Sequence, residues 1–399
     1  MKNAVRTIIG IGLFFVLSIG FLTGSQIYLK SKLESKYNDN VDKALAKDLS
    51  VDKFQGIYIQ NKELQNNNLM LYGSSELSTT FIPQHPNNFY IDKESNYNIS
   101  VIGRGHCQSI IHAINTGALN NTSSNKKIAF VLSPQWFTED GLSKEGFEAN
   151  FSELQFYKLM NNKNISKELK LKICDRIIQF TDESSNLKNI KLYSKLYSNN
   201  NVISNIGLGL LKPYYYVKEE ALYTLDLKQS LDKINEVKDE ESKVNKKPIN
   251  WTSELEQAVK EGEKAATNNE YGVYDSYFEK YIKNDYEKLK GSYKTLKYTE
   301  SPEYNDLDLL IEICKETGVK PLLISVPVHS KWYDYCGFDK NNKEEYYEKI
   351  REIALKNNIQ LLDLSKKENE KYVLCDIMHL GWKGWVYINE EIDQYYNEN

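Results

Sequence analysis

Residues 69–77, LMLYGSSEL, constrain the fold of this chain more than any other stretch. Residues 69–72 form a short apolar run of the kind that makes a buried strand. The glycine and two serines that follow place a hydroxyl at the carboxyl edge of a sheet, where open α/β folds bind ligands. If a helix follows, its first N–H groups point back at that hydroxyl, which suits a serine nucleophile with an oxyanion intermediate. A plain strand-to-helix turn with a serine N-cap also fits these residues.

The same strand-like pattern recurs four times, at residues 98–102, 127–133, 320–327 and 359–364. Amphipathic helical patterns lie between these runs and after them, at residues 109–119, 305–317, 342–357 and 384–396. This alternation predicts an α/β fold with one five-stranded, parallel, doubly wound sheet. Residues 143–298 are instead rich in Lys and Glu, with apolar residues three or four apart. They predict a helical insertion between the third and fourth strands, with helices at 147–160, 166–180, 214–237 and 252–290.

The N-terminus carries a membrane signal. Residues 7–29 contain no charged side chain, and a helix needs about 20 residues to cross the hydrocarbon core. Lys2 and Arg6 precede the run, which favours a cytoplasmic N-terminus with everything after Lys30 outside. A cleaved signal peptide is the alternative, but the apolar run is long for one and no A-x-A-like site follows. We therefore predict an anchor at 1–30, a membrane-proximal linker at 31–67 and an extracytoplasmic domain at 68–399.

Composition argues against two classes of function. The formal net charge of −4 is small, and the chain has no basic arm or basic patch with interleaved aromatic residues, so we expect no nucleic-acid partner. The five cysteines lack C-x-x-C spacing, and no two of the five histidines sit at metal-ligand spacing on one helix. We predict no metal site and no cofactor.

A base and an acid for the serine lie near the C-terminus. Asp376 and His379 are three residues apart in a predicted loop just before the last helix. That spacing lets the carboxylate reach Nδ1 of the imidazole and leaves Nε2 free to face Ser75. D-x-x-H also arises by chance, as a helix-start Asp and a surface His. Its pairing with the Gly-Ser-Ser strand end makes the catalytic interpretation stronger.

Together these features resemble the SGNH (GDSL-type) hydrolases, and in finer detail one branch of them, the DltD family. The resemblance runs from the N-terminal anchor to the C-terminus. It rests on the motifs GSSEL at 73–77, GRGHCQ at 103–108, SPQWF at 133–137, PVHSKWYDYCG at 327–337 and HLGWKGW at 379–385. It implies a part in the D-alanylation of teichoic acids on Gram-positive cell envelopes.

The resemblance also implies roles for individual residues. It makes Ser75 the nucleophile, with Ser74 as the alternative, Gly105 an oxyanion glycine, and Asp376 and His379 the acid and the base. The chain departs from the pattern where an SGNH protein offers an oxyanion Asn, because here Gln135 follows Pro134. Loss of one donor typically costs about 10²–10³ in rate.

Three further side chains are candidates for substrate binding. Arg104 either binds a phosphate of the polymer or pairs with Glu76. Trp332 and Tyr333 follow the fourth strand and either wall a substrate pocket or pack a loop.

Taken together, these expectations predict a membrane-anchored protein that transfers D-alanyl groups from a donor of the pathway to lipoteichoic acid. It would work beside a membrane-bound acyltransferase at the outer face of the cytoplasmic membrane, through an acyl-enzyme on Ser75. Two alternatives stay open. One is an esterase or thioesterase with the same triad, and the other is a scaffold that presents polymer to the acyltransferase without doing chemistry.

Overall fold

The computed structural model describes residues 2–119, 126–182, 186–199, 201–238 and 245–398. Its centre is a five-stranded sheet in which all the strand pairs are parallel. The order across the sheet is β2-β1-β3-β4-β5, the order of doubly wound folds of the flavodoxin type. The predicted α/β fold is therefore confirmed. The strands are β1 (Leu69–Gly73), β2 (Ile99–Gly103), β3 (Lys127–Leu132), β4 (Lys320–Ser325) and β5 (Gln360–Asp363).

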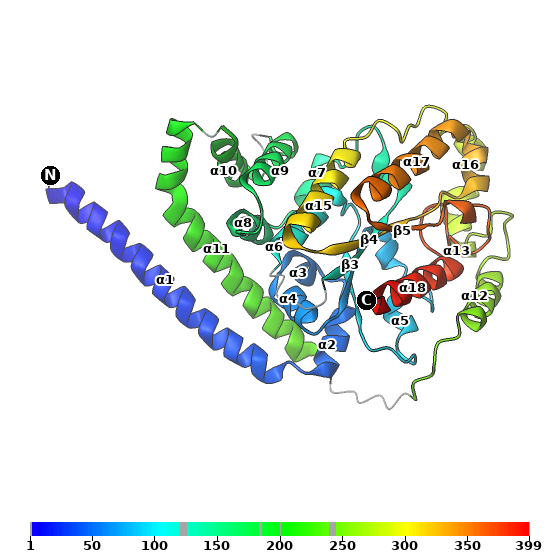
Figure 1. The fold of residues 1–399 in the computed structure, drawn as a ribbon, viewed down its shortest axis with the longest axis horizontal. Helices are drawn as coiled ribbons and strands as arrows, with labels where there is room; N and C mark the ends of the chain where they lie inside the picture. The colour runs from blue at the N-terminus through cyan, green and yellow to red at the C-terminus, as the bar shows by residue number, and fades with distance from the viewer. Residues whose placement is uncertain (1, 120–125, 183–185, 200, 239–244, 399) are drawn as a thin grey trace.

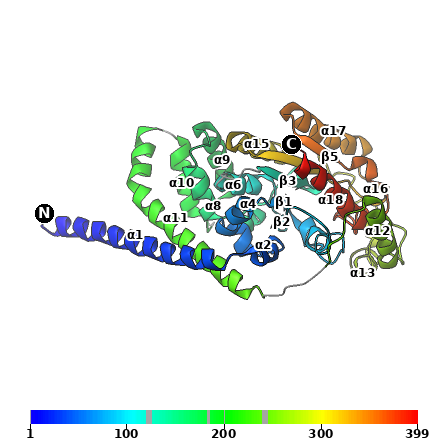
Figure 2. The same ribbon diagram turned by 60° about the horizontal axis from the view of Figure 1, so that its bottom comes forward.

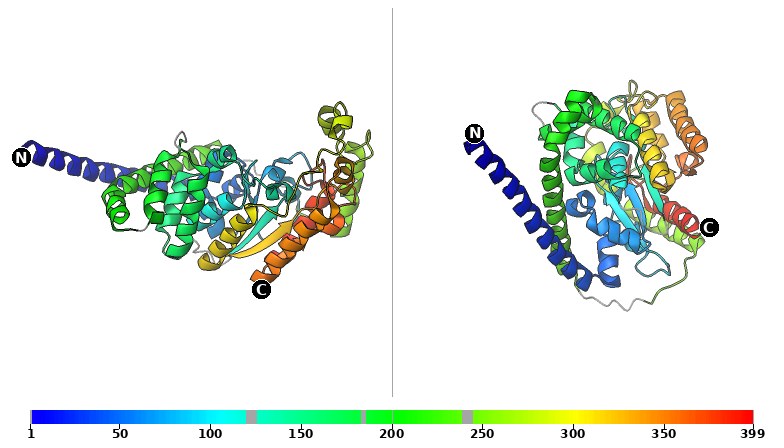
Figure 3. Two further views of the ribbon diagram at one scale, coloured as in Figure 1. Left: turned by 90° about the horizontal axis from the view of Figure 1, so that it is seen from above. Right: turned by 60° about the vertical axis from the view of Figure 1, so that its left-hand side comes forward.

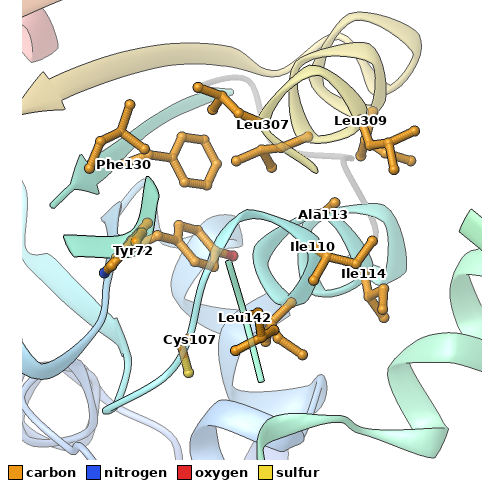
Figure 4. Close-up of a cluster of buried hydrophobic side chains, with 14 of the residues drawn as sticks. Tyr72, Cys107, Ile110, Ala113, Ile114, Phe130, Leu142, Leu307 and Leu309 are labelled. Carbon is orange, nitrogen blue, oxygen red and sulfur yellow. The ribbon is translucent and has the colours of Figure 1, made fainter. Parts of the chain in front are cut away.

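Helices cover both faces of this sheet (Figure 1). Every residue of β1 is buried, and its side chains alternate between two apolar clusters. Tyr72 and Phe130 stack at 5.1 Å on one face, against α6 and α15, as Figure 4 shows. Leu71 belongs to the other cluster, with Trp385 of the last helix. The helices of these two layers are α6 (Ser109–Ala118), α15 (Glu303–Thr317) and α17 (Lys340–Asn357) on the first face, and α12 (Trp251–Ala265) and α18 (Trp382–Asn397) on the second.

The residues between β3 and α15 form the predicted helical insertion. Its first helices extend the layer that begins with α6, while α12 packs on α18 on the opposite face (Figure 1). The elements that precede α12 are η2 (Pro134–Phe137), α7 (Lys144–Asn150), α8 (Glu153–Asn161), α9 (Lys167–Phe180), α10 (Lys188–Asn199) and α11 (Val202–Glu236). Those that follow it are α13 (Asp275–Tyr277), the π-helical turn η3 (Phe278–Ile282) and α14 (Tyr286–Leu289).

Three helix predictions in the insertion were wrong in extent. The helix predicted at 147–160 is two helices, because the Ser152 hydroxyl accepts from the Gln155 N–H and starts α8 anew. The helix predicted at 214–237 begins at Val202 instead, with Pro213 inside it on an exposed turn. The helix predicted at 252–290 ends at Ala265, and Gly272 then turns the chain with φ of 72°.

The N-terminal helix α1 (Lys2–Lys36) contains the charge-free run. An 18-residue window within its segment Gly12–Lys36 has a mean hydropathy of 1.6, and among the described residues this is the helix long and apolar enough to cross a membrane. The first half of α1 stands clear of the rest of the molecule (Figures 2 and 3).

The segment 31–67, predicted as a linker, is folded instead. It holds the end of α1 and the helices α2 (Asp39–Ala46), α3 (Val51–Gln55) and α4 (Tyr58–Gln65). Leu33, Val41 and Leu45 are buried against Leu227 and Ile234 of α11. The apolar residues at helical spacing in this polar segment therefore have a packing surface, and the folded domain includes them.

Candidate active site

The carboxyl ends of β1 and β2 carry the first part of the site. Gly73 is paired with Gly103, so the chain leaves both strands at the same level of the sheet. Gly103 has φ of 138°, and a Cβ there would lie 1.9 Å from the Gly73 carbonyl oxygen. Only glycine allows this close approach. The Ser74 hydroxyl donates to the Arg104 carbonyl at 3.3 Å and ties the two loops together.

Ser75 begins the turn η1 (Ser75–Ser78), and its side chain meets the C-terminal loop. Its Oγ lies 2.9 Å from Nε2 of His379, and Nδ1 of the same ring lies 2.7 Å from Oδ2 of Asp376. With Nδ1–H donating to the carboxylate, Nε2 accepts from the serine hydroxyl. The structure thus brings the three predicted catalytic residues into one hydrogen-bonded chain, across 304 positions of sequence between Ser75 and His379.

The loop between β5 and α18 holds the imidazole in place. Asp376 is 3% exposed, and its Oδ1 accepts the backbone N–H groups of Met378 and His379 at 2.8 and 2.7 Å. The His379 carbonyl accepts from the Cys375 N–H at 2.9 Å and closes the loop. Asp376 therefore both shapes the turn and orients the ring.

Charge around His379 sets its protonation. Burial of the imidazole lowers its pKa, but the hydrogen bond to Asp376 and the charges of Asp376 and Glu76 outweigh this. The net effect raises the pKa of His379 above its usual value. The ring is therefore a stronger base than a free histidine, as a group that accepts a serine proton needs to be.

Ser74 and Glu76 flank the proposed nucleophile in different ways. The Ser74 side chain is 3% exposed and faces Arg104 rather than His379. Glu76 is fully buried, and its Oε1 accepts the Ser74 N–H at 2.7 Å. Burial raises the pKa of Glu76, although the Ser74 N–H and His379 oppose this shift. From the sequence, Glu76 was expected only as a partner for Arg104, and its contact with the serine turn was not predicted.

The candidate oxyanion donors lie at the same edge. Among the described residues, no hydrogen-bond partner is found for the backbone N–H groups of Ser75 and Gly105 or for the Gln135 side-chain amide. Asn150 donates to the Gly105 carbonyl at 3.0 Å and steadies that loop. The Ser133 hydroxyl lies 3.5 Å from Glu76, which joins the loop that holds Gln135 to the serine turn.

The three predicted substrate-binding residues have different surroundings. Arg104 is partly exposed, and within the described parts of the chain its guanidinium makes no ion pair, so it does not pair with buried Glu76. Trp332 and Tyr333 are 1% and 6% exposed in the apolar core. They lie in α16 (Ser330–Cys336), and buried side chains of this kind pack a helix rather than wall an open pocket.

An aromatic row beside the triad was not predicted. The Tyr274 N–H donates to the Cys375 carbonyl at 2.8 Å. The centroid of the Tyr274 ring lies 5.3 Å from that of Phe81 and 5.5 Å from that of Tyr277. The ring centroids of Tyr277 and Tyr281 are 5.0 Å apart. Burial and the nearby Asp376 charge raise the pKa of Tyr274 to about 12. Gly272 was the available signal in the sequence, because a glycine inside the long helix predicted at 252–290 argues against a continuous helix there.

The doubly wound α/β domain, with hydrogen-bonded Ser, His and Asp side chains at the carboxyl edge of its sheet, fits the SGNH-like class of α/β proteins that the sequence predicts. Comparison with known proteins narrows this class. The family model described as "DltD protein" matches residues 46–397.

Three relatives share this description over most of their length. Protein DltD of Bacillus subtilis (strain 168) is 32% identical over 382 residues, which is 96% of each chain. Protein DltD of Staphylococcus aureus is 31% identical over 341 residues, covering 85% of this chain and 83% of the relative. Protein DltD of Lacticaseibacillus rhamnosus is 25% identical over 405 residues, covering 98% and 92%. The chain belongs to the DltD family, whose proteins take part in teichoic-acid D-alanylation.

Proposed function

We propose that this chain transfers D-alanyl groups to lipoteichoic acid through an acyl-enzyme on Ser75. The observation that carries the proposal is the continuous hydrogen-bonded chain from Ser75 through His379 to Asp376. A protein that only holds polymer has no need of a hydroxyl, a base and a buried carboxylate in this order.

In the first half of the reaction, Ser75 Oγ attacks the carbonyl carbon of a D-alanyl ester or thioester, and its proton passes to His379 Nε2. Asp376 keeps the proton on Nδ1 and stabilises the imidazolium. Backbone N–H groups at Ser75 and Gly105, with the Gln135 amide, face the oxyanion. The bond to the donor oxygen or sulfur then breaks, and that atom takes the proton from His379.

In the second half, a hydroxyl of the polymer attacks the acyl-serine carbonyl. His379 takes the hydroxyl proton and returns it to Ser75 Oγ as the acyl–serine bond breaks. The D-alanyl ester is then on the polymer and the triad is restored. Transfer and hydrolysis share the acyl-enzyme and differ only in whether polymer or water attacks it.

Two features suit a polymeric, anionic acceptor. Arg104 makes no ion pair among the described residues and lies in the loop that also carries Gly105, where its guanidinium can bind a phosphate by two parallel hydrogen bonds. The aromatic row of Phe81, Tyr274, Tyr277 and Tyr281 offers a partly exposed apolar wall beside Asp376. We assign Arg104 to the polymer backbone and the aromatic row to the acceptor path.

The reaction would take place at the outer face of the cytoplasmic membrane. With α1 as the anchor and the folded domain at the outer face, the site meets both the lipid-attached polymer and a donor delivered by the membrane-bound acyltransferase. The serine site then belongs at the last transfer step of the pathway.

The test is the D-alanyl ester content of lipoteichoic acid in cells that carry single variants. Ser75→Ala removes one oxygen from a partly buried turn and should reduce D-alanylation to the level of a gene deletion. Ser74→Ala is the matched control, since it removes the same atom from the neighbouring residue, and it should retain activity. His379→Ala should match Ser75→Ala, because the members of a triad act as a unit.

The opposite pattern would reject the proposal. If membrane-inserted Ser75→Ala and His379→Ala chains both support normal D-alanylation, the chain is a scaffold. If Ser74→Ala alone abolishes it, the nucleophile has been assigned to the wrong serine.

A further inference from the structure

The first turns of α11 expose apolar side chains that a water-facing helix does not need. Ile203 and Leu210 are 83% and 77% exposed, and Val202, Ile206 and Tyr214 are exposed beside them. The opposite side of the same turns is also apolar, because Leu208, Leu211 and Tyr215 pack on the core. A helix that is apolar all round is normally covered on every side, by protein or by lipid.

The direction of α11 is set by its contacts with α1. Gln26 of α1 donates to Glu220 at 2.8 Å, and Lys36 donates to Asn235 at 2.7 Å, so the two helices run in the same direction. Residues 202–216 precede Glu220 on α11, as most of the charge-free run precedes Gln26 on α1. The exposed end of α11 therefore points the same way as the apolar half of α1, as Figures 1 and 2 show.

The charge of this region suits an anionic membrane surface. The whole chain carries a net charge of −4, yet residues 186–217 contain no Asp or Glu. Their charged residues are four lysines, three on α10 and one on α11: Lys188, Lys191, Lys195 and Lys212. Tyrosines at 193, 197, 214 and 216 accompany them. Exposed aliphatic residues with lysine and tyrosine around them are the composition of helices that lie in the lipid interface.

We propose that residues 202–216 of α11 rest in the lipid leaflet next to the folded domain, as a second membrane contact that does not span the bilayer. A single spanning helix leaves the domain free to turn about the helix axis. A second contact on α11 prevents that rotation. It therefore also fixes the direction in which the carboxyl edge of the sheet faces in the plane of the membrane.

The experiment uses the full chain, reconstituted in vesicles of phosphatidylcholine and phosphatidylglycerol and labelled at one introduced cysteine with an environment-sensitive fluorophore. All five native cysteines are buried, so an exposed cysteine is labelled selectively. Ile203→Cys is the test position. Leu355→Cys on α17 is the matched control, since both parent side chains are 83% exposed. Leu17→Cys in α1 reports insertion of the anchor.

The expected result is a blue-shifted emission at position 203 that is quenched by nitroxide-bearing lipids, as at position 17, with neither effect at position 355. A water-like emission at 203 would overturn the proposal. So would a blue shift that nitroxide lipids do not quench, because the face would then be covered by protein, such as a second copy of this chain. Absence of quenching at position 17 would remove the anchor on which the proposal rests.

Discussion

Asp376→Asn separates the orienting role of this carboxylate from its structural role. Asn keeps an oxygen where Oδ1 accepts the N–H groups of Met378 and His379, at 2.8 and 2.7 Å, so the turn is retained. Its NH₂ group then replaces Oδ2, 2.7 Å from His379 Nδ1. That group donates to Nδ1, which moves the ring proton to Nε2. The contact with Ser75 survives as a hydrogen bond, but Nε2 can no longer accept the serine proton.

The size of the effect follows from this tautomer change. The same substitution in a serine-protease triad lowers kcat about 10⁴-fold, which corresponds to about 5.4 kcal/mol of transition-state stabilisation. We expect a loss of this order here, with little change in folding stability. Asp376→Ala would be a poorer test, because two partly buried N–H groups would lose their acceptor, at up to about 1–3 kcal/mol each.

The assay is the second-order rate of Ser75 phosphonylation by a fluorophosphonate, followed by mass spectrometry on the full chain in detergent. This reaction needs an activated serine but neither donor nor polymer. Ser75→Ala should show no labelling at this peptide, and Ser74→Ala should label at the parent rate. If Asp376→Asn reacts within about tenfold of the parent, a difference of about 1.4 kcal/mol, the orienting role is refuted.

Three further results are expected. The rate of Ser75 labelling should rise with pH through a midpoint above about 6.5. The reason is that the raised pKa of His379 keeps its imidazole protonated up to a higher pH, and only the neutral ring acts as a base. A midpoint below about 6.5 would contradict the geometry. Gly103→Ala should lower the free energy of unfolding by at least about 1–3 kcal/mol through backbone strain, and the clash of the new methyl with Gly73 adds to this loss. Gly105→Ala is the control, because no atom lies within 4 Å of the position of its Cβ, and it should change the free energy of unfolding by no more than about 0.5 kcal/mol. Equal denaturation midpoints for the two variants would be contrary evidence. The chain should stay in the membrane fraction after high-salt washing and leave it only with detergent, and recovery of a mature form that lacks residues 1–29 would show a signal peptide instead.

The sheet was predictable because each strand is a short apolar run that ends in a small or polar residue or directly before one, and burial on both faces demands such runs. Asp376 and His379 could be placed together because their contact is local, three residues apart in one turn. Ser75 could be placed opposite them only by inference from the topology, since parallel strands end at one edge.

Other features depended on contacts that the sequence does not display. Residues 31–67 look like a linker because their apolar positions are few, and the cluster that buries Leu33 and Leu45 includes Leu227 and Ile234 of α11, far along the chain. The helix was predicted to start at residue 214, directly after Pro213, yet this proline lies on an exposed turn inside α11, which begins at Val202. Trp332 and Tyr333 follow a strand end, as site residues often do, but their burial is set by tertiary packing.

The central claim is a covalent D-alanyl ester on Ser75, and mass spectrometry of the acid-quenched full chain tests it most directly. Membranes that carry out D-alanylation should yield a Ser75 peptide heavier by one alanyl group. Addition of lipoteichoic acid should remove this adduct as D-alanyl ester appears on the polymer. Polymer D-alanylation that proceeds with no adduct on Ser75, or an adduct that persists in the Ser75→Ala chain, would contradict the account.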